Sequence, residues 1–380
     1  MPYYKPLKEW TDRKALERTV EGLTRIRQQI REELPEQMAD RRLLLGTWNI
    51  RNFDDNRFGC GPRLEESFYY LAEIIGAFDI LAVQEICFDL GPLKRLMSHL
   101  GYQYKYIVTD VTEGAGGNSE RLGFIYNESK VQFRGVAGEL VLPEGLLIED
   151  GKWKRQFART PFGCNFQSGW FKFMFSTVHI YFGEDSPGSP EYKRRIKEID
   201  TIAKIISNRS DTEDYNYILV GDFNIESYGS QGFNALEKHG FEVIKNDKGS
   251  NDKKTKYYDQ ISFKARKGEL RLSEAEKSHG VLDVLQSLYR EEDYPQYADR
   301  VKAVLDARIG RLKQAADKPA KGAGEADDLA AAAAIRASDD KCREFYLSEW
   351  RTYQLSDHLP LWVELDIDFS DTYLRSLVAP

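Results

Sequence analysis

Polar side chains of one chemical kind follow several apolar runs in this chain. The clearest case is "ILVGDFNIES" (218–227), where an apolar run leads through a glycine to Asp222 and Asn224. "GTWNIR" places Asn49 after another apolar run, and "AVQE" places Glu85 after a third. Reactive groups of layered α/β proteins gather where strands end, because a rigid sheet positions the loops there. We therefore expect these side chains to share one site.

Two further segments add histidine to this set. "SDH" supplies Asp357 and His358 just before the last apolar run, and "TVHI" supplies His179. Carboxylates and amides without a Cys–His cluster favour a hard cation bound through oxygen, which suits Mg²⁺ better than Zn²⁺. Histidines beside such a cation can transfer protons. Together these residue types predict metal-assisted hydrolysis of a phosphoester.

Apolar periodicity predicts the elements that position these residues. The spacing of three and four over 11–34 predicts an amphipathic helix, which Pro35 ends. Further helices are predicted at 63–78 and 189–207, and strands at 41–50, 79–86, 121–127, 171–180, 257–263 and 359–367, with another in "YILVGDFN". Strands and helices alternate, which predicts an α/β layered fold.

The chain divides unevenly. We expect residues 1–40 to be an N-terminal helical extension and 41–380 to be one catalytic domain. Residues 265–349 are helix-rich and charged, and strands resume after them, so we interpret them as an insertion into that domain. Because 318–340 is rich in Ala, Gly and charges, we expect the sandwich to fold without the insertion.

Composition narrows the classes of protein. The 380 residues are 41% hydrophobic, enough for a large core, and the formal net charge of −7 argues against a passive DNA coat. The charged N-terminus does not resemble a signal peptide, and no apolar run approaches about 20 residues. Four scattered cysteines fit free thiols in a reducing compartment. We therefore expect a cytoplasmic protein that does not use a membrane.

Seven segments in order resemble the endonuclease/exonuclease/phosphatase superfamily, and its deoxyribonuclease I branch most closely. They are "TWNIRNF", "DILAVQEI", "ERLGFIYN", "TVHI", "LVGDFN", "YYDQISF" and "SDHLPLWVEL". The resemblance covers 43–263 and 355–366. It implies a four-layer α/β/β/α sandwich of two mixed sheets, and hydrolysis of phosphodiesters or phosphomonoesters with Mg²⁺ or Mn²⁺.

The resemblance also implies roles for individual residues. Asn49, Glu85 and Asp357 resemble the family's metal site. His179 resembles one catalytic histidine with Glu120 as its orienting carboxylate, and His358 resembles the other with Asp259 as its partner. Asp222 and Asn224 resemble the pair that holds the attacking water and the phosphoryl oxygen. Residues of a strand that are two apart point the same way, so both side chains are expected to meet one phosphate.

Substrate contacts follow from the same resemblance. Arg159 of "FARTP" and Arg51 of "NIR" match arginines that contact the DNA in the deoxyribonucleases. Asn118 lies in "EGAGGNSER", near the place where those nucleases carry an aromatic residue. We expect a Mg²⁺-dependent endonuclease with DNA as substrate, restrained by narrow substrate choice, a regulatory protein partner or the segments outside the resemblance.

Alternatives remain at this stage. A phosphatase or phosphodiesterase acting on a lipid headgroup or inositol phosphate would share the same residues, since a fold does not decide a substrate. A binding module would not need the complete polar set. The attacking water could be activated by Asp222 or by either histidine, and the sequence does not assign the acid.

Overall fold

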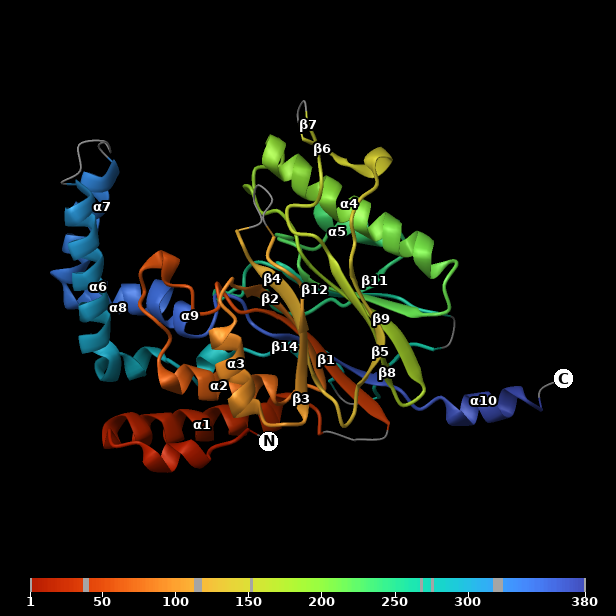
Figure 1. Ribbon diagram of the computed structural model, residues 1–380, viewed down its shortest axis with the longest axis horizontal. Coiled ribbons are helices and arrows are strands. Elements are labelled where there is room, and N and C mark those ends of the chain that lie inside the picture. Colours follow the sequence, from red (N-terminus) through yellow and green to blue (C-terminus); the bar gives the residue numbers. More distant parts are fainter. Residues whose placement is uncertain are drawn as a thin grey trace.

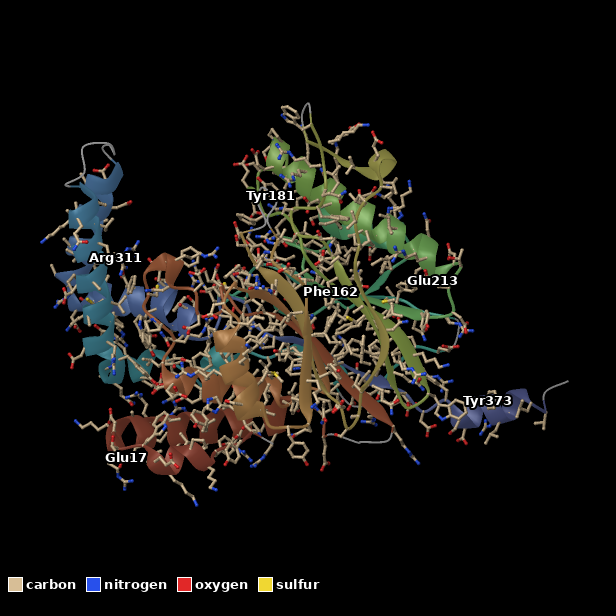
Figure 2. All side chains as sticks on the ribbon, viewed as in Figure 1. Glu17, Phe162, Tyr181, Glu213, Arg311 and Tyr373 are labelled. Carbon is tan, nitrogen blue, oxygen red and sulfur yellow. The ribbon has the colours of Figure 1, made fainter. Side chains whose placement is uncertain are left out.

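Two mixed β-sheets pack face to face in the computed structural model, with helices on both outer faces (Figure 1). The structure describes residues 2–36, 41–112, 118–150, 153–266, 269–274, 277–316 and 324–378. This is the four-layer sandwich that the sequence resemblance implied. Phe162 of one sheet stacks on Phe124 of the other in the middle of the sandwich (Figure 2).

The first sheet has seven strands among the described residues, in the order β13-β15-β1-β2-β4-β3, with β14 also paired to β15. Their bounds are β1 Arg42–Asn49, β2 Ile80–Ile86, β3 Tyr104–Val108, β4 Arg121–Asn127, β13 Arg271–Leu272, β14 His279–Val281 and β15 Leu361–Asp366. Strands β1 and β2 are parallel. Their carboxyl ends therefore meet at one edge of the sandwich.

The second sheet has the order β11-β12-β10-β9-β8-β5. Its strands are β5 Gln132–Glu139, β8 Phe162–Ser168, β9 Phe171–His179, β10 Asn216–Asp222, β11 Glu242–Val243 and β12 Asp259–Lys264. A separate ribbon pairs β6 (Ile148–Asp150) with β7 (Trp153–Arg155). Strand β10 is buried along its whole length, which explains its continuous apolar run.

Helices cover the outer faces of both sheets (Figure 1). The helices of the described residues are α1 Arg13–Glu33, α2 Glu65–Ile75, α3 Gly91–Leu100, α4 Pro190–Ser210, α5 Gln231–Lys238, α6 Tyr294–Ala316, α7 Gly324–Arg336, α8 Asp339–Phe345, α9 Arg351–Gln354 and α10 Ser370–Ser376. Of these, α6, α7 and α10 stand away from the sheets (Figure 1). The larger core lies between the sheets and extends under α2 and α3. A second core lies between β9, β10 and helices α4 and α5.

Helix α1 matches the amphipathic pattern of the sequence. Its N-cap Asp12 accepts a hydrogen bond from the Ala15 backbone N–H, and the helix ends just before Pro35. Leu23 and Ile26 are buried in the larger core, and Arg18 pairs with the carboxylate of Glu66 on α2. The extension is thus packed on the catalytic body.

The four cysteines are unpaired and buried. Burial raises the pKa of the Cys87 and Cys164 thiols to about 12, so neither is a thiolate at neutral pH. Among the described helices, none combines the length and the apolar character needed to span a bilayer.

The segment 265–349 is bound into the sandwich more deeply than expected. Strands β13 and β14 both pair with β15, so part of the segment extends the first sheet. Tyr289 and Tyr346 are almost fully buried in the larger core. The α6–α7 hairpin stands to one side of the sheets, and α8 lies beside it (Figure 1). The expectation that the sandwich folds without this segment does not fit the packing.

Deleting residues 265–349 and joining the ends with a short linker is therefore expected to give insoluble or unfolded protein. The deletion removes two paired strands and many core side chains, and each large buried side chain is worth about 3–5 kcal/mol. Soluble yield and far-UV circular dichroism would measure the result. A soluble, cooperatively unfolding product would show instead that the segment is an independent addition.

Candidate active site

Strand register aligns three candidate residues in one row across the second sheet. Asp222 at the end of β10 is the register partner of His179 on β9 and of Asp259 on β12. All three side chains are buried. The glycine before Asp222 makes this close approach possible, because Gly221 has φ +128° and a Cβ there would meet the Val178 carbonyl oxygen at 2.1 Å.

Two residues of the first sheet complete the centre from the opposite side. Strand β2 has an irregular register between Val83 and Ile86, and Glu85 there adopts φ +62°. The Asn49 Nδ2 donates to Glu85 Oε1 at 2.8 Å and to Asp222 Oδ2 at 3.1 Å. Asn49 therefore joins the two sheets at the site.

Both histidines present the same ring nitrogen to Asp222. The Nδ1 of His179 lies 3.1 Å from Glu120 Oε2, and the Nδ1 of His358 lies 2.7 Å from Asp259 Oδ2. Their Nε2 atoms face Asp222 Oδ2 at 3.5 Å and 3.7 Å. A carboxylate at Nδ1 fixes the proton there and orients the ring. Each histidine thus contacts the carboxylate that the sequence resemblance gave it, Glu120 for His179 and Asp259 for His358.

The carboxylates decide the charge of the two rings. Burial and the neighbouring Arg159 oppose a charged His179, but Glu120 and Asp222 outweigh them and raise its pKa. Burial likewise opposes a charged His358, yet Asp259 and Asp222 raise its pKa well above the ordinary value. The carboxylates thus stabilise the imidazolium form of both rings.

Glu85 has the environment of a metal ligand. Burial, then the charges of Glu120 and Asp357, raise the pKa of Glu85. Several carboxylates that repel one another in a buried place are stabilised by a divalent cation. The groups Glu85–Glu120–His179 and Asp222–Asp259–His358 each bring their ligand atoms within 4.8 Å of one another. The donor set therefore fits a divalent metal, with oxygen as its main ligand.

Asn224 differs from the expected geometry. Strand β10 ends at Asp222, and Asn224 adopts φ +53°, so strand alternation does not relate the two side chains. The Asn224 backbone N–H donates to Asp222 Oδ1 at 2.9 Å, and its Nδ2 donates to the Ile180 carbonyl at 2.8 Å. Asn224 fixes the central carboxylate and the end of β9 with these bonds.

The three residues expected to contact the substrate differ in their exposure to solvent. Arg159 is buried and pairs with Glu120. Arg51 contacts Asp357, with its Nε 3.5 Å from Oδ2, and also bonds Thr352 after the π-helical turn η6 (Tyr346–Trp350). Asn118 is exposed, and its carbonyl accepts from Arg57. The rest of its loop, 113–117, lies outside the described residues.

Several supporting residues escaped sequence reasoning. Ser356 Oγ donates to the Asn49 carbonyl at 2.6 Å and accepts from the His358 backbone N–H at 3.0 Å. Its position directly before Asp357 and His358 in "SDH" was the sequence signal for this supporting role.

The basic run "KRRIK" (193–197) lies on α4. Its Arg194 and Arg195 are buried, so they are not free to contact a nucleic acid. Arg195 instead donates to the Asn224 carbonyl at 2.7 Å.

Comparison with known proteins gives the family and the fold of this chain. The family described as "Endonuclease/Exonuclease/phosphatase family" matches residues 46–242, a little over half of the chain. An endonuclease/exonuclease/phosphatase family protein from Bacteroides thetaiotaomicron is 17% identical with a TM-score of 0.50, over 87% of this chain and 99% of that one.

A functionally unknown conserved protein from Enterococcus faecalis V583 is similar in the same way. It is 15% identical with a TM-score of 0.51, over 86% of this chain and all of that one. At these identities the likeness concerns the fold. No curated protein matches the sequence.

Proposed function

Because this chain belongs to the endonuclease/exonuclease/phosphatase family, we propose that it is a metal-dependent phosphodiesterase that cuts DNA internally, as an endonuclease. The observation that carries the proposal is the position of Asp222 between two carboxylate-held histidines, with Glu85 opposite. This set offers a base, two acids and a metal site within a few ångströms. In-line hydrolysis of a phosphodiester needs these parts.

The metal would be held by oxygen ligands from β1, β2 and the loop before β15. Glu85 and Asp357 would bind Mg²⁺ or Mn²⁺, and the amide of Asn49, already in contact with Glu85, would complete the set. When bound, the cation polarises a phosphoryl oxygen and offsets negative charge. Arg51 orients Asp357, since its Nε lies 3.5 Å from that carboxylate.

The proton transfers fall to the residues of the second sheet. Asp222 takes a proton from the attacking water, whose oxygen bonds to phosphorus while the bond to the leaving oxygen breaks. The Nε2–H groups of His179 and His358 face the same centre and donate to a phosphoryl oxygen and to the leaving oxygen. Glu120 and Asp259 hold both rings, and Asn224 N–H holds Asp222. Groups held in this way need little reorganisation during reaction.

DNA is proposed because the seven catalytic segments resemble the deoxyribonuclease branch most closely. The unpaired buried cysteines support a reducing setting such as the cytosol. A nuclease there must be restrained, so we also propose slow turnover of intact chromosomal DNA by the isolated protein.

Purified protein should be assayed on supercoiled plasmid, a single-stranded oligodeoxynucleotide, RNA, inositol phosphates and sphingomyelin vesicles, with Mg²⁺ and with EDTA. We expect metal-dependent cuts within DNA chains, faster at low salt because phosphate contacts weaken as salt rises. Rapid, salt-insensitive hydrolysis of an inositol phosphate or of the lipid, with DNA left intact, would overturn the endonuclease proposal.

A further inference from the structure

Three exposed phenylalanines lie on loops that leave the strand ends of the active site. Phe88 is 71% exposed and follows Glu85 by three residues; Phe182 is 45% exposed and follows His179 by three. Phe58 is 47% exposed and lies on the loop after Asn49. Single exposed apolar side chains are ordinary, but three at the ends of three active-site strands form a pattern.

Short chains of contacts join two of these rings to the catalytic groups. The Phe58 ring lies 5.6 Å from the Arg51 guanidinium, which in turn contacts Asp357. The Phe182 ring lies 6.3 Å from the Tyr258 ring, which lies 5.8 Å from the ring of His358. Both phenylalanines are thus one residue removed from the site.

Phe88 is tied to the site in a similar way. Its ring lies 5.8 Å from the guanidinium of Arg121, the residue after Glu120, and Arg121 Nη1 donates to the Phe88 carbonyl at 2.8 Å. Phe182 also has a cation against it, since the fully buried Arg195 lies 5.1 Å from its ring. Each of the three rings therefore has a guanidinium within cation–π distance.

These features suit a ligand that combines planar rings with negative charge. Unpaired nucleobases stack on aromatic side chains, and stacking is tolerant of sequence because every base has a π-face. The bases of an intact duplex are stacked on each other and cannot reach such rings. Exposed rings beside arginines are found where single strands bind, because the aromatic faces can take bases. The buried Arg195 holds the Phe182 loop and does not contact the ligand, since it donates to the Phe182 and Glu184 carbonyls.

We propose that Phe58, Phe88 and Phe182 form an aromatic rim that stacks the unpaired bases flanking the scissile phosphate of a single-stranded nucleic acid. The inference rests on the proposed function, because it assumes that a phosphodiester occupies the site between them. It makes unpaired segments the preferred substrate and intact duplex a poor one. It also supplies the aromatic contact that the "EGAGGNSER" loop lacks.

A membrane surface fits the same rings less well. Inserting Phe58 and Phe88 into lipid would bring Arg51 and Arg121 toward the hydrocarbon, together with Asp357 beside Arg51. Charged groups in hydrocarbon are costly. The ion pairs around the rim therefore favour a hydrated ligand over a bilayer.

Binding in EDTA tests the rim without depending on turnover. Fluorescence anisotropy should compare a labelled single-stranded oligonucleotide, the same sequence as a blunt duplex, and vesicles of phosphatidylcholine with phosphatidylserine. The variants are Phe58→Leu, Phe88→Leu, Phe182→Leu and the triple substitution, which keep an apolar side chain but remove the planar face. Tyr102→Leu is the matched control, since Tyr102 is exposed on the α3–β3 loop at the opposite edge of the sheet.

We expect the wild type to bind the single strand at least about 10-fold more tightly than the duplex. The triple variant should bind the single strand about 100-fold more weakly, since one lost base stack costs about 5- to 100-fold. Tyr102→Leu should bind like the wild type. Unchanged single-strand affinity in the triple variant, equal affinity for duplex, or loss of vesicle binding alone would each overturn the rim.

Failure of the proposed function would be visible separately. Wild-type protein with Mg²⁺ or Mn²⁺ should hydrolyse methyl 4-nitrophenyl phosphate, a diester without a nucleobase. Absence of turnover on this diester and on DNA would reject the phosphodiesterase, whatever the binding results. Turnover combined with Phe-independent binding would reject only the rim.

Discussion

Asp222→Asn is expected to lower kcat on DNA by about 10³-fold or more, with little change in the fold. Both histidine Nε2 atoms face the Asp222 carboxylate, and Asn49 and Asn224 hold it in place. Asparagine keeps the shape and one acceptor oxygen but cannot take a proton from water. Loss of a general base typically costs about 10²–10⁴ in rate. Initial rates at saturating substrate and metal would measure the effect.

A matched variant separates chemistry from folding in this experiment. Asp214→Asn removes a charge from an aspartate whose side chain is mostly exposed and paired with Arg266, outside the site. It should retain the wild-type rate and the wild-type unfolding midpoint. If Asp222→Asn kept more than a tenth of the activity while staying folded, Asp222 would not be the base, and one of the histidines would have to take that role.

Glu85→Gln is expected to weaken metal activation strongly and, at the same time, to stabilise the metal-free protein. Losing a metal ligand should raise the Mn²⁺ concentration for half-maximal activity by more than ~10- to 100-fold, the effect typical of removing a residue that only orients a ligand. EDTA should abolish wild-type activity, and Mg²⁺ or Mn²⁺ should restore it. Metal titrations of activity and calorimetric Mn²⁺ binding would measure the change.

The stability effect follows from the pKa of Glu85. Burial and two neighbouring carboxylates raise that pKa, so the charged form is disfavoured in the folded protein relative to the unfolded chain. At neutral pH the carboxylate therefore lowers the free energy of unfolding, and neutral glutamine removes this cost. Urea unfolding in EDTA should give a higher midpoint for Glu85→Gln than for the wild type.

The exposed Glu242 provides the control for this pair of effects. Glu242→Gln should change neither metal activation nor stability by more than about 0.5 kcal/mol. A destabilised Glu85→Gln protein with normal metal activation would mean that Glu85 serves only as an acceptor for Asn49 and the Asn52 backbone.

Local sequence was sufficient for the strands and for the polar residues at their ends. The continuous apolar runs before Glu85 and Asp222 predicted strands, and β2 and β10 are buried along almost their whole length. The spacing over 11–34 predicted α1, since a helix buries one face at a period of 3.6. These features depend on residues that are close in the chain, so local sequence patterns are enough to predict them. The resemblance of the seven segments in order predicted the sandwich fold.

Other features of the site depend on contacts between residues far apart in the sequence, which local patterns do not predict. The register that aligns Asp222 with Asp259 depends on pairing between β10 and β12, and the turn at Asn224 replaces the strand alternation that its spacing suggested. Arg195 belongs to the charged run "KRRIK" (193–197), yet tertiary packing buries it against the Asn224 carbonyl. Segment 265–349 was interpreted as an insertion because local patterns show its helices. Its two short strands form only by pairing with β15, and no local pattern shows that pairing. Such contacts join residues far apart in sequence, and only the folded chain brings them together.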